Sequence, residues 1–246
     1  MHREAHEHQH VRPAETPIFM DPVSQMSYGE RAALEGFLTQ IRPALAIEIG
    51  VAEGGSLHRL AAYAEEVHAF DLVSAPAAVA GLSNVHFHLG DSHTLLPRLL
   101  ATFEETGRCV DFVLVDGDHS APGVRRDVED LLASTAVTDT LILLHDTMNE
   151  EVRSGLEQVS FSSYPKVAYV DLDCVPGHLF VAPELRNELW GGFGIVLVDT
   201  RHLAYFATSP LRRYAPSFPI LNDYRDRLRA EQAIESEATR PMTEGL

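Results

Sequence analysis

Short apolar runs alternate with segments of helical period through much of the chain. The runs lie at residues 46–49, 67–70, 85–89, 110–115 and 141–144. The helical segments lie at 57–64, 75–82, 95–106 and 124–132, and an earlier helix begins after a capping box formed by Ser27 and Glu30 and ends at Pro43. Apolar strands that alternate with helices are typical of a parallel sheet covered on both faces. The pattern therefore predicts an α/β fold with a doubly wound, mostly parallel sheet.

The last third of the chain has a different pattern. Strand-like segments at 166–171 and 194–199 are separated by a partly aromatic segment, 175–192, which contains Pro and Gly. These features predict a terminal hairpin with an insertion, followed by a charged surface helix at 223–240. We therefore divide the chain into an N-terminal tail and substrate-side segment (1–26), one α/β domain with the insertion (27–210) and a charged tail (211–246). The histidine-rich start of the chain is expected to be disordered.

The amino-acid composition and net charge argue against some classes of binding partner. The chain has 246 residues, 45% of them apolar, and a formal net charge of −17. Such a surface repels nucleic acid and anionic membranes, so neither is expected as a partner. The sequence shows neither a membrane span nor a signal-peptide core, and Cys109 and Cys174 lie in no metal or redox spacing. We expect a cytoplasmic protein with reduced thiols and leave open whether it forms a homo-oligomer.

A glycine-rich turn follows the first apolar run. The sequence from Ala46 to Leu57 predicts a strand, a tight turn and a helix start, with Glu48, Gly50, Gly54, Gly55 and Ser56 at the positions that can face a nucleotide-like ligand. The glycines are expected to let the backbone approach that ligand. A dinucleotide fingerprint would need glycine where Ala52 stands, which counts against NAD. The spacing resembles motif I of the class I S-adenosylmethionine (SAM) methyltransferases.

Acidic residues recur where predicted strands end. They are Glu48, Asp71, Asp91, Asp116 and Asp146. Ligands of open α/β sheets bind at the carboxyl ends of strands, so these acids are expected to border one site, although Asp is also common in turns and helix caps. We expect Asp71 to bind ribose hydroxyls, Asp91 and Ser92 to flank adenine, and Ser56 to hold a ligand carboxylate.

Two later segments carry a closer resemblance. Residues 112–120 (FVLVDGDHS) and 143–147 (LLHDT) look like the small-molecule O-methyltransferases, a group that includes catechol O-methyltransferase and the metal-dependent methyltransferases of macrolide-sugar and cephalosporin biosynthesis. The resemblance implies a seven-stranded sheet with the last strand antiparallel. It implies SAM as cofactor, with Asp116 beside SAM as well as on the metal, and Asp146 as a further metal ligand. It also places the general base at His119.

The chemistry of the residues at the ends of the fourth and fifth predicted strands also supports a bound metal ion. The fourth and fifth strands are expected to be neighbours, so Asp116 and Asp146 can converge on one cation, which would activate a hydroxyl group. His145 and Thr147 stand where the family has carboxylate or amide groups. We count His145 as a third metal ligand and a second catalytic candidate, and leave Asp118 and Asn149 as further ligands. Magnesium is the expected ion, but an imidazole would suit manganese, iron or zinc better.

The function expected from these features is transfer of a methyl group from SAM to a hydroxyl of a small molecule, such as a sugar or other secondary metabolite. The alternatives are a metal-independent SAM methyltransferase that uses His119 or His145 alone, an NAD(P)-dependent oxidoreductase, and a SAM-binding protein without catalysis. The sequence does not identify the methyl acceptor. We expect the insertion at 175–192, together with residues 18–20, to cover it.

Overall fold

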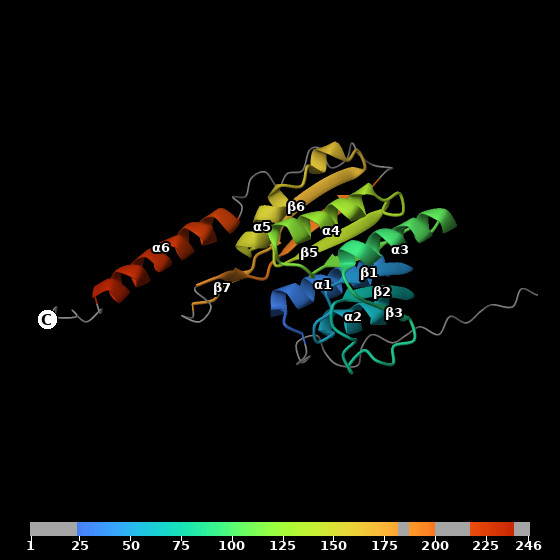
Figure 1. Ribbon diagram of the computed structural model, residues 1–246, viewed down its shortest axis with the longest axis horizontal. Coiled ribbons are helices and arrows are strands. Elements are labelled where there is room, and N and C mark those ends of the chain that lie inside the picture. The colour runs from blue at the N-terminus through green and yellow to red at the C-terminus, as the bar shows by residue number, and fades with distance from the viewer. Residues whose placement is uncertain (1–23, 182–186, 200–216, 239–246) are drawn as a thin grey trace, which may run out of the picture.

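A seven-stranded sheet forms the centre of the protein, in a computed structural model that describes residues 24–181, 187–199 and 217–238 (Figure 1). Its strand order is β3-β2-β1-β4-β5-β9-β6, and all the pairs are parallel except those that β9 makes. The strands are β1 (Leu45–Ile49), β2 (Glu66–Asp71), β3 (Val85–Leu89), β4 (Phe112–Val115), β5 (Thr140–His145), β6 (Val167–Val175) and β9 (Phe193–Val198). The predicted α/β fold, with an antiparallel last strand, is confirmed.

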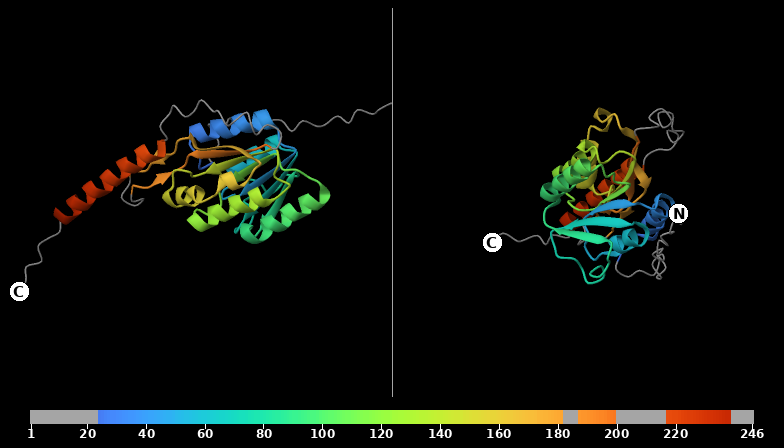
Figure 2. Two further views of the ribbon diagram at one scale, coloured as in Figure 1. Left: turned by 90° about the horizontal axis from the view of Figure 1, so that it is seen from above. Right: turned by 90° about the vertical axis from the view of Figure 1, so that its right-hand side faces the viewer.

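Helices cover both faces of this sheet (Figure 2). They are α1 (Tyr28–Ile41), α2 (Gly55–Tyr63), α3 (Ser92–Thr106), α4 (Ala121–Ala133) and α5 (Glu150–Glu157), with a short 3-10 helix, η1, at Phe161–Ser163. Apolar side chains of α1 and α2 pack in one core cluster, and those of α3, α4 and α5 pack in another. The central strands β1, β4 and β5 are buried along their whole length, as expected for a sheet with two covered faces.

The prediction of a helix at 75–82 is wrong. The connection between β2 and β3 makes turns there, because its hydrogen bonds join residues three apart or less, as from Val79 N–H to the Pro76 carbonyl. Pro76 and Gly81 both disfavour a helix interior. Val79 is buried against Gly54, so this connection packs on the glycine-rich turn.

The last third of the chain adds the predicted hairpin. β9 pairs antiparallel with both β5 and β6 and so lies between them. The insertion contains a small second sheet of β7 (His178–Leu179) and β8 (Leu189–Trp190). The predicted late helix is present but begins earlier than predicted. It is α6, which spans Ser217–Ala238 and extends away from the sheet in Figure 1 and in the left view of Figure 2.

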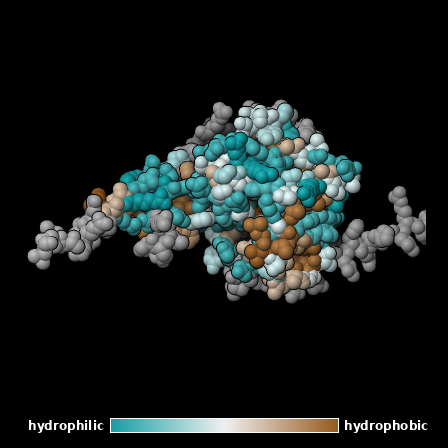
Figure 3. Space-filling model, in the orientation of Figure 1, coloured by the Kyte–Doolittle hydropathy of each residue, from teal (hydrophilic) through white to brown (hydrophobic). Residues whose placement is uncertain are grey.

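The exposed surface in the first view is mostly hydrophilic, with a hydrophobic area over the part of the fold that holds β1, β2 and α2 (Figure 3). Large apolar side chains are exposed where β2 and β3 end, at Leu72, Val73 and Leu89. In the segments that the structure describes, no helix has the length and apolar character needed to traverse a bilayer. The first residues of the chain, with their histidines, and residues 18–20 lie outside the described segments.

Candidate active site

Two adjoining cavities lie at the carboxyl ends of the central strands. The larger, of about 570 Å³, is bordered by the ends of β1, β2 and β4 and by the start of α3, and its wall includes Asp71, Asp91, Ser92 and Asp116. This volume is within the range of small-molecule sites. The smaller, of about 120 Å³, is bordered by Ser56, Asp116, His119, His145 and Asp146. Of the five acids predicted at strand ends, only Glu48 lines neither cavity, because it is fully buried behind the turn.

Three glycines of the glycine-rich turn pack closely against other parts of the protein, and two of them, Gly50 and Gly55, also border the cavities. Gly50 has a φ of +87°, and a Cβ there would lie 2.0 Å from the carbonyl oxygen of Asp116. A Cβ on Gly54, the N-cap of α2 with φ +85°, would meet Val79 at 2.9 Å, and one on Gly55 would meet the Ser24 backbone at 2.6 Å. The missing side chains therefore make room for protein, and the turn is held tightly against the end of β4.

Glu48 and Ser56 form a buried pair beneath this turn. The Ser56 hydroxyl donates to Glu48 Oε1 at 2.5 Å. Ser56, for which the sequence predicted a contact with a ligand carboxylate, also borders the smaller cavity. Burial raises the pKa of Glu48 well above its usual value, and Asp116 and Asp71 raise it further. Glu48 Oε2 is buried and has no hydrogen-bonding partner among the described residues. A positively charged ligand group would satisfy that oxygen.

Asp71 ties the end of β2 to the glycine-rich turn. Its Oδ2 accepts hydrogen bonds from the backbone N–H groups of Val51 at 2.8 Å and Ala52 at 3.0 Å, and its Oδ1 accepts from Val73 at 2.8 Å. Burial opposes ionisation, but these donors prevail and lower the pKa of Asp71. The carboxylate stays in the wall of the larger cavity, where the sequence predicted it.

Asp91 and Ser92 begin α3 at the far wall of the same cavity. Asp91 is the N-cap and accepts from His93 N–H at 3.0 Å, while the Ser92 hydroxyl donates to buried Asp127 at 2.9 Å. Both therefore have structural roles as well as a position beside the cavity.

Three carboxylates and two imidazoles meet where β4 and β5 end. We call this group the acid–histidine cluster; it contains Glu30, Asp116, His119, His145 and Asp146. His145 Nδ1 lies 2.8 Å from Asp116 Oδ1, and its Nε2 lies 3.2 Å from Glu30 Oε1. His119 Nε2 lies 3.1 Å from Asp146 Oδ2 and 3.6 Å from Asp116 Oδ1. The two histidines thus bridge the three acids.

Mutual attraction within the cluster shifts its pKa values strongly. Hydrogen bonds to Asp116 and Asp146 raise the pKa of His119 to about 9. Burial opposes protonation of His145, but Asp116, Glu30 and Asp146 together raise its pKa well above 6.5. Burial likewise disfavours the ionised form of Asp116, yet the two histidines lower its pKa to about 2. The protein therefore places positive charge between these acids, and a metal cation could supply the same charge.

The metal donors that the structure brings together differ in part from the predicted set. One ligand atom each of Asp116, His119 and Asp146 lies within 4.8 Å of the others, so His119 joins the two acids that the sequence assigned to a metal. His145 contacts Asp116 from the other side and also reaches Glu30. Asp118 and Asn149, the additional ligands considered, both accept backbone hydrogen bonds: Asp118 accepts from Ser120 N–H just before α4, and Asn149 caps α5.

The insertion closes against this cluster. Asp146, with a φ of +54°, accepts a hydrogen bond from Gly191 N–H at 2.6 Å, and the Trp190 ring meets the His119 ring edge-on with centroids 5.5 Å apart. Gly192 N–H donates to Glu30 Oε1. The predicted insertion thus places an aromatic side chain beside the candidate base.

Sequence reasoning missed Glu30 as a site residue. It assigned Glu30 to the capping box of α1, which the structure confirms: Ser27 N–H donates to Glu30 Oε2 at 2.6 Å and Glu30 N–H donates to the Ser27 hydroxyl at 3.3 Å. The same carboxylate is 2% exposed and also faces His145. A capping box signals a helix start and carries no information about a second, distant partner, so no local pattern could have revealed this contact.

Comparisons with known proteins support the fold of this region. Residues 47–147 match a family model described as a methyltransferase domain, and this stretch includes every member of the acid–histidine cluster except Glu30. No curated protein matches the chain in sequence.

Solved structures with the same fold include MycE methyltransferase from the mycinamycin biosynthetic pathway, in complex with Mg, SAH and mycinamycin VI. It has 15% identity and a TM-score of 0.51, over 78% of this chain and 55% of that one, so the chain spans about half the length of MycE. A proposed O-methyltransferase from Klebsiella pneumoniae has 17% identity and a TM-score of 0.50, over 73% and 84% of the two chains. A proposed methyltransferase from Escherichia coli has 14% identity and a TM-score of 0.50, over 73% and 92%. At these identities the likeness establishes the Rossmann-like methyltransferase fold.

Proposed function

We propose that this protein transfers a methyl group from SAM to a hydroxyl group of a small molecule, and that a divalent metal ion assists the transfer. The observation that carries the proposal is the junction of the two cavities, whose walls share Val51, Ala52, Asp116 and His119. A space of cofactor size thus opens directly onto the acid–histidine cluster.

The residues around the larger cavity fit SAM. Glu48 lines neither cavity, but its unpartnered oxygen lies just behind the glycine-rich turn, and a local movement of that turn would let it accept from a ligand ammonium group. Asp71 can hold the glycine-rich turn and a ribose hydroxyl together, since a carboxylate has about four acceptor sites. Asp91 and Ser92 stand where they can border the adenine ring.

The cluster fits a divalent cation. Asp116 and Asp146 would hold it through carboxylate oxygens, with an imidazole from His145, which leaves His119 free for the proton. The acids favour magnesium, the ion present with MycE, whereas the imidazole donors favour manganese or another transition metal. When bound, SAM supplies an electrophilic methyl group and the cation lowers the pKa of the acceptor hydroxyl.

His119 is the proposed general base. It borders both cavities, is only half-buried, and lies beside Trp190, so a substrate hydroxyl can reach its ring. The neighbouring carboxylates hold His119 protonated at neutral pH, since they raise its pKa to about 9. His119 can therefore accept a proton only when other positive charge neutralises Asp116 and Asp146, and the base and the cation are needed together.

The acceptor is proposed to be a hydroxylated small molecule, such as a sugar or other secondary metabolite. The insertion supports this, because Trp190 forms an aromatic wall beside His119, and aromatic walls suit the apolar faces of sugars and of ring compounds. Mycinamycin VI, which is bound to MycE, serves as a starting point for an acceptor screen.

Calorimetry with S-adenosylhomocysteine tests the cofactor assignment. Asp71→Ala should weaken binding by about 10-fold to 150-fold, because a hydrogen bond to a charged group contributes about 1.5–3 kcal/mol. Glu105→Ala, an exposed residue of α3, serves as the matched control and should bind normally. Equal affinity in both variants would refute the ribose assignment, and tight binding of NADH would favour an oxidoreductase.

Turnover with a panel of hydroxylated acceptors tests the metal. Activity should fall to background after exhaustive chelation, return with magnesium or manganese, and be lost in Asp146→Ala. Full activity after chelation would instead support metal-independent transfer by His119 or His145. SAM binding without turnover on any acceptor would favour a binding protein that lacks catalysis.

A further inference from the structure

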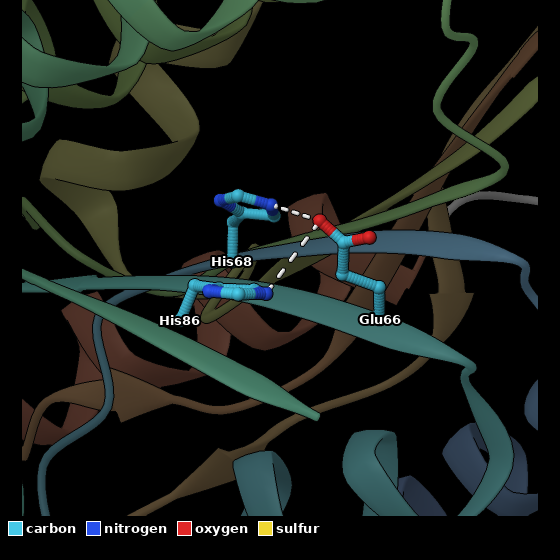
Figure 4. Close-up of side chains that lie close together, drawn as sticks. All are labelled: Glu66, His68 and His86. Atoms are coloured by element: carbon cyan, nitrogen blue, oxygen red, sulfur yellow. Dashed lines mark hydrogen bonds and ion pairs between the residues drawn. The ribbon is translucent and has the colours of Figure 1, made fainter. Parts of the chain in front are cut away.

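A second group of metal-binding side chains lies at the opposite end of the sheet, away from both cavities. Glu66 and His68 are two residues apart on β2, and His86 on the edge strand β3 is the direct partner of His68 in the parallel register. Residues two apart on a strand point to the same face, and so do paired residues of neighbouring strands. Figure 4 shows the three side chains converging, with the Glu66 carboxylate in front of both imidazoles.

The distances fit one small cation. Glu66 Oε1 lies 2.7 Å from His68 Nε2 and 3.7 Å from His86 Nε2, and one ligand atom of each residue lies within 4.8 Å of the others (Figure 4). Ligands about 2.0–2.1 Å from a tetrahedral zinc ion are about 3.3 Å apart. The observed separations lie on both sides of that value, so small side-chain rotations would bring the three atoms to zinc-binding positions.

Outer contacts orient two of the three side chains. His68 Nδ1 lies 2.9 Å from His88 Nε2, and Arg108 donates to both oxygens of the carboxylate, to Glu66 Oε2 at 2.7 Å and to Oε1 at 3.2 Å. Metal-binding histidines typically donate their second ring N–H to a neighbour, and metal-binding carboxylates are themselves hydrogen-bonded. With His68 Nδ1–H donating to His88, the lone pair of His68 Nε2 would point toward Glu66 Oε1, where the ion would sit.

The simpler interpretation is a packed ionic group, in which Arg108 alone neutralises Glu66. It explains the low pKa of Glu66, about 2, since the hydrogen bonds from Arg108 are its largest cause. It does not explain why three imidazoles stack beside that carboxylate, with the His68 ring centroid 4.8 Å from His86 and 5.1 Å from His88.

We propose that Glu66, His68 and His86 bind one zinc ion that fastens the edge strand β3 to β2. Two imidazole nitrogens and one carboxylate oxygen suit zinc better than magnesium or calcium. The site lies near the amino ends of both strands, whereas the cavities lie at their carboxyl ends, so the ion is structural and takes no part in methyl transfer. His86 is 56% exposed, which leaves a fourth position open to water.

An ion bound by both β2 and β3 would stabilise the edge of the sheet. Among the described strands, β3 is the last on its side of the sheet and pairs with β2 alone. Edge strands present unpaired backbone groups and pair readily with other chains. An ion held by both strands would keep β3 in register, and with it Gly90 and Asp91, which border the larger cavity.

Anomalous diffraction from crystals of the full chain soaked in zinc chloride tests the site directly. Site-resolved detection is needed because the acid–histidine cluster and His2, His6, His8 and His10 also offer zinc ligands. We expect a zinc peak about 2.1 Å from Glu66 Oε1, His68 Nε2 and His86 Nε2. Absence of this peak when zinc occupies other histidines of the same crystal would overturn the proposal.

His86→Ala supplies the solution test, because an exposed side chain can be removed without disturbing the core. Exposed His178 provides the matched control, His178→Ala. The rise in Tm produced by zinc should be smaller in His86→Ala than in the wild type and unchanged in His178→Ala. An equal zinc-induced rise in all three proteins would refute the site.

Discussion

The Glu30 carboxylate connects the first helix to the acid–histidine cluster, and replacing it tests the contribution of its charge. Glu30→Gln keeps the shape of the side chain, and glutamine at this position also supports a capping box. Ser27 N–H and Gly192 N–H donate to different oxygens of the carboxylate, so the single amide oxygen of glutamine can accept only one of them. The variant therefore removes one of these hydrogen bonds together with the negative charge that faces His145 at 3.2 Å.

The magnitude follows from the pKa of Glu30. Burial disfavours its ionised form, but His145 and Ser27 outweigh burial and lower the pKa from 4.5 to about 2. Because one pKa unit corresponds to about 1.4 kcal/mol, ionised Glu30 stabilises the folded state by up to about 3 kcal/mol. A folded-state pKa below the unfolded one gives stability that is complete above about pH 4.5 and is lost as the pH falls toward 2.

Urea unfolding at several pH values measures this contribution, with a chelator present so that no bound metal contributes. Glu30→Gln should lower the free energy of unfolding by about 2–3 kcal/mol from pH 7 to pH 5, and the gap should narrow below pH 4.5. Glu105→Gln, on the exposed face of α3, should change it by less than about 0.5 kcal/mol. A gap below about 1 kcal/mol at pH 7, or one that stays constant down to pH 3, would contradict the reasoning.

Three further substitutions test other parts of the site. Gly50→Ala should lower Tm by about 6–12 °C, because residue 50 has a positive φ and the new Cβ would lie 2.0 Å from the Asp116 carbonyl oxygen. The control Gly36→Ala, whose Cβ would meet no atom within 4 Å, should leave Tm equal or slightly higher, and an equal loss in both variants would refute the packing argument. Burial raises the pKa of Asp127 to about 6, so ionisation of this carboxyl opposes folding. As the pH rises from 4 to 7.5, Asp127→Asn should become more stable than the wild type by up to about 3 kcal/mol in urea unfolding, and a stability difference that does not change with pH would contradict this. His119→Ala should lower kcat by about 10²-fold to 10⁴-fold and leave the calorimetric affinity for S-adenosylhomocysteine unchanged, and unaltered kcat would remove His119 as the base.

The alternation of strands and helices was predictable because it depends on local periodicity. Buried runs such as 110–115 and 141–144 identified the central strands, and the order of their acids placed Asp116 and Asp146 side by side. The helix expected at 75–82 failed for a local reason as well, since its proline and glycine outweigh its alanine content.

The composition of the acid–histidine cluster was only partly predictable. Asp116, His119, His145 and Asp146 lie in two short segments at the ends of neighbouring strands, so sheet geometry alone brings them together. Glu30 and Trp190 reach the cluster from a helix and an insertion that are far away in sequence. Their positions depend on how those elements pack on the sheet, and periodicity says nothing about that packing.

The position of β9 sets the order in which this protein can be completed. β6 precedes β9 in the chain, yet β9 lies between β5 and β6, so β6 has no strand to join until β9 has been synthesised. The residues just before β9 also bring Gly192 to Glu30, which lies 162 residues earlier. A ribosome-bound chain that lacks β9 therefore carries every residue of the acid–histidine cluster but has no strand between β5 and β6 to hold the insertion against it. We expect the nascent protein to remain incomplete, with an open sheet edge at β5 that needs protection from other chains, until its last strand emerges.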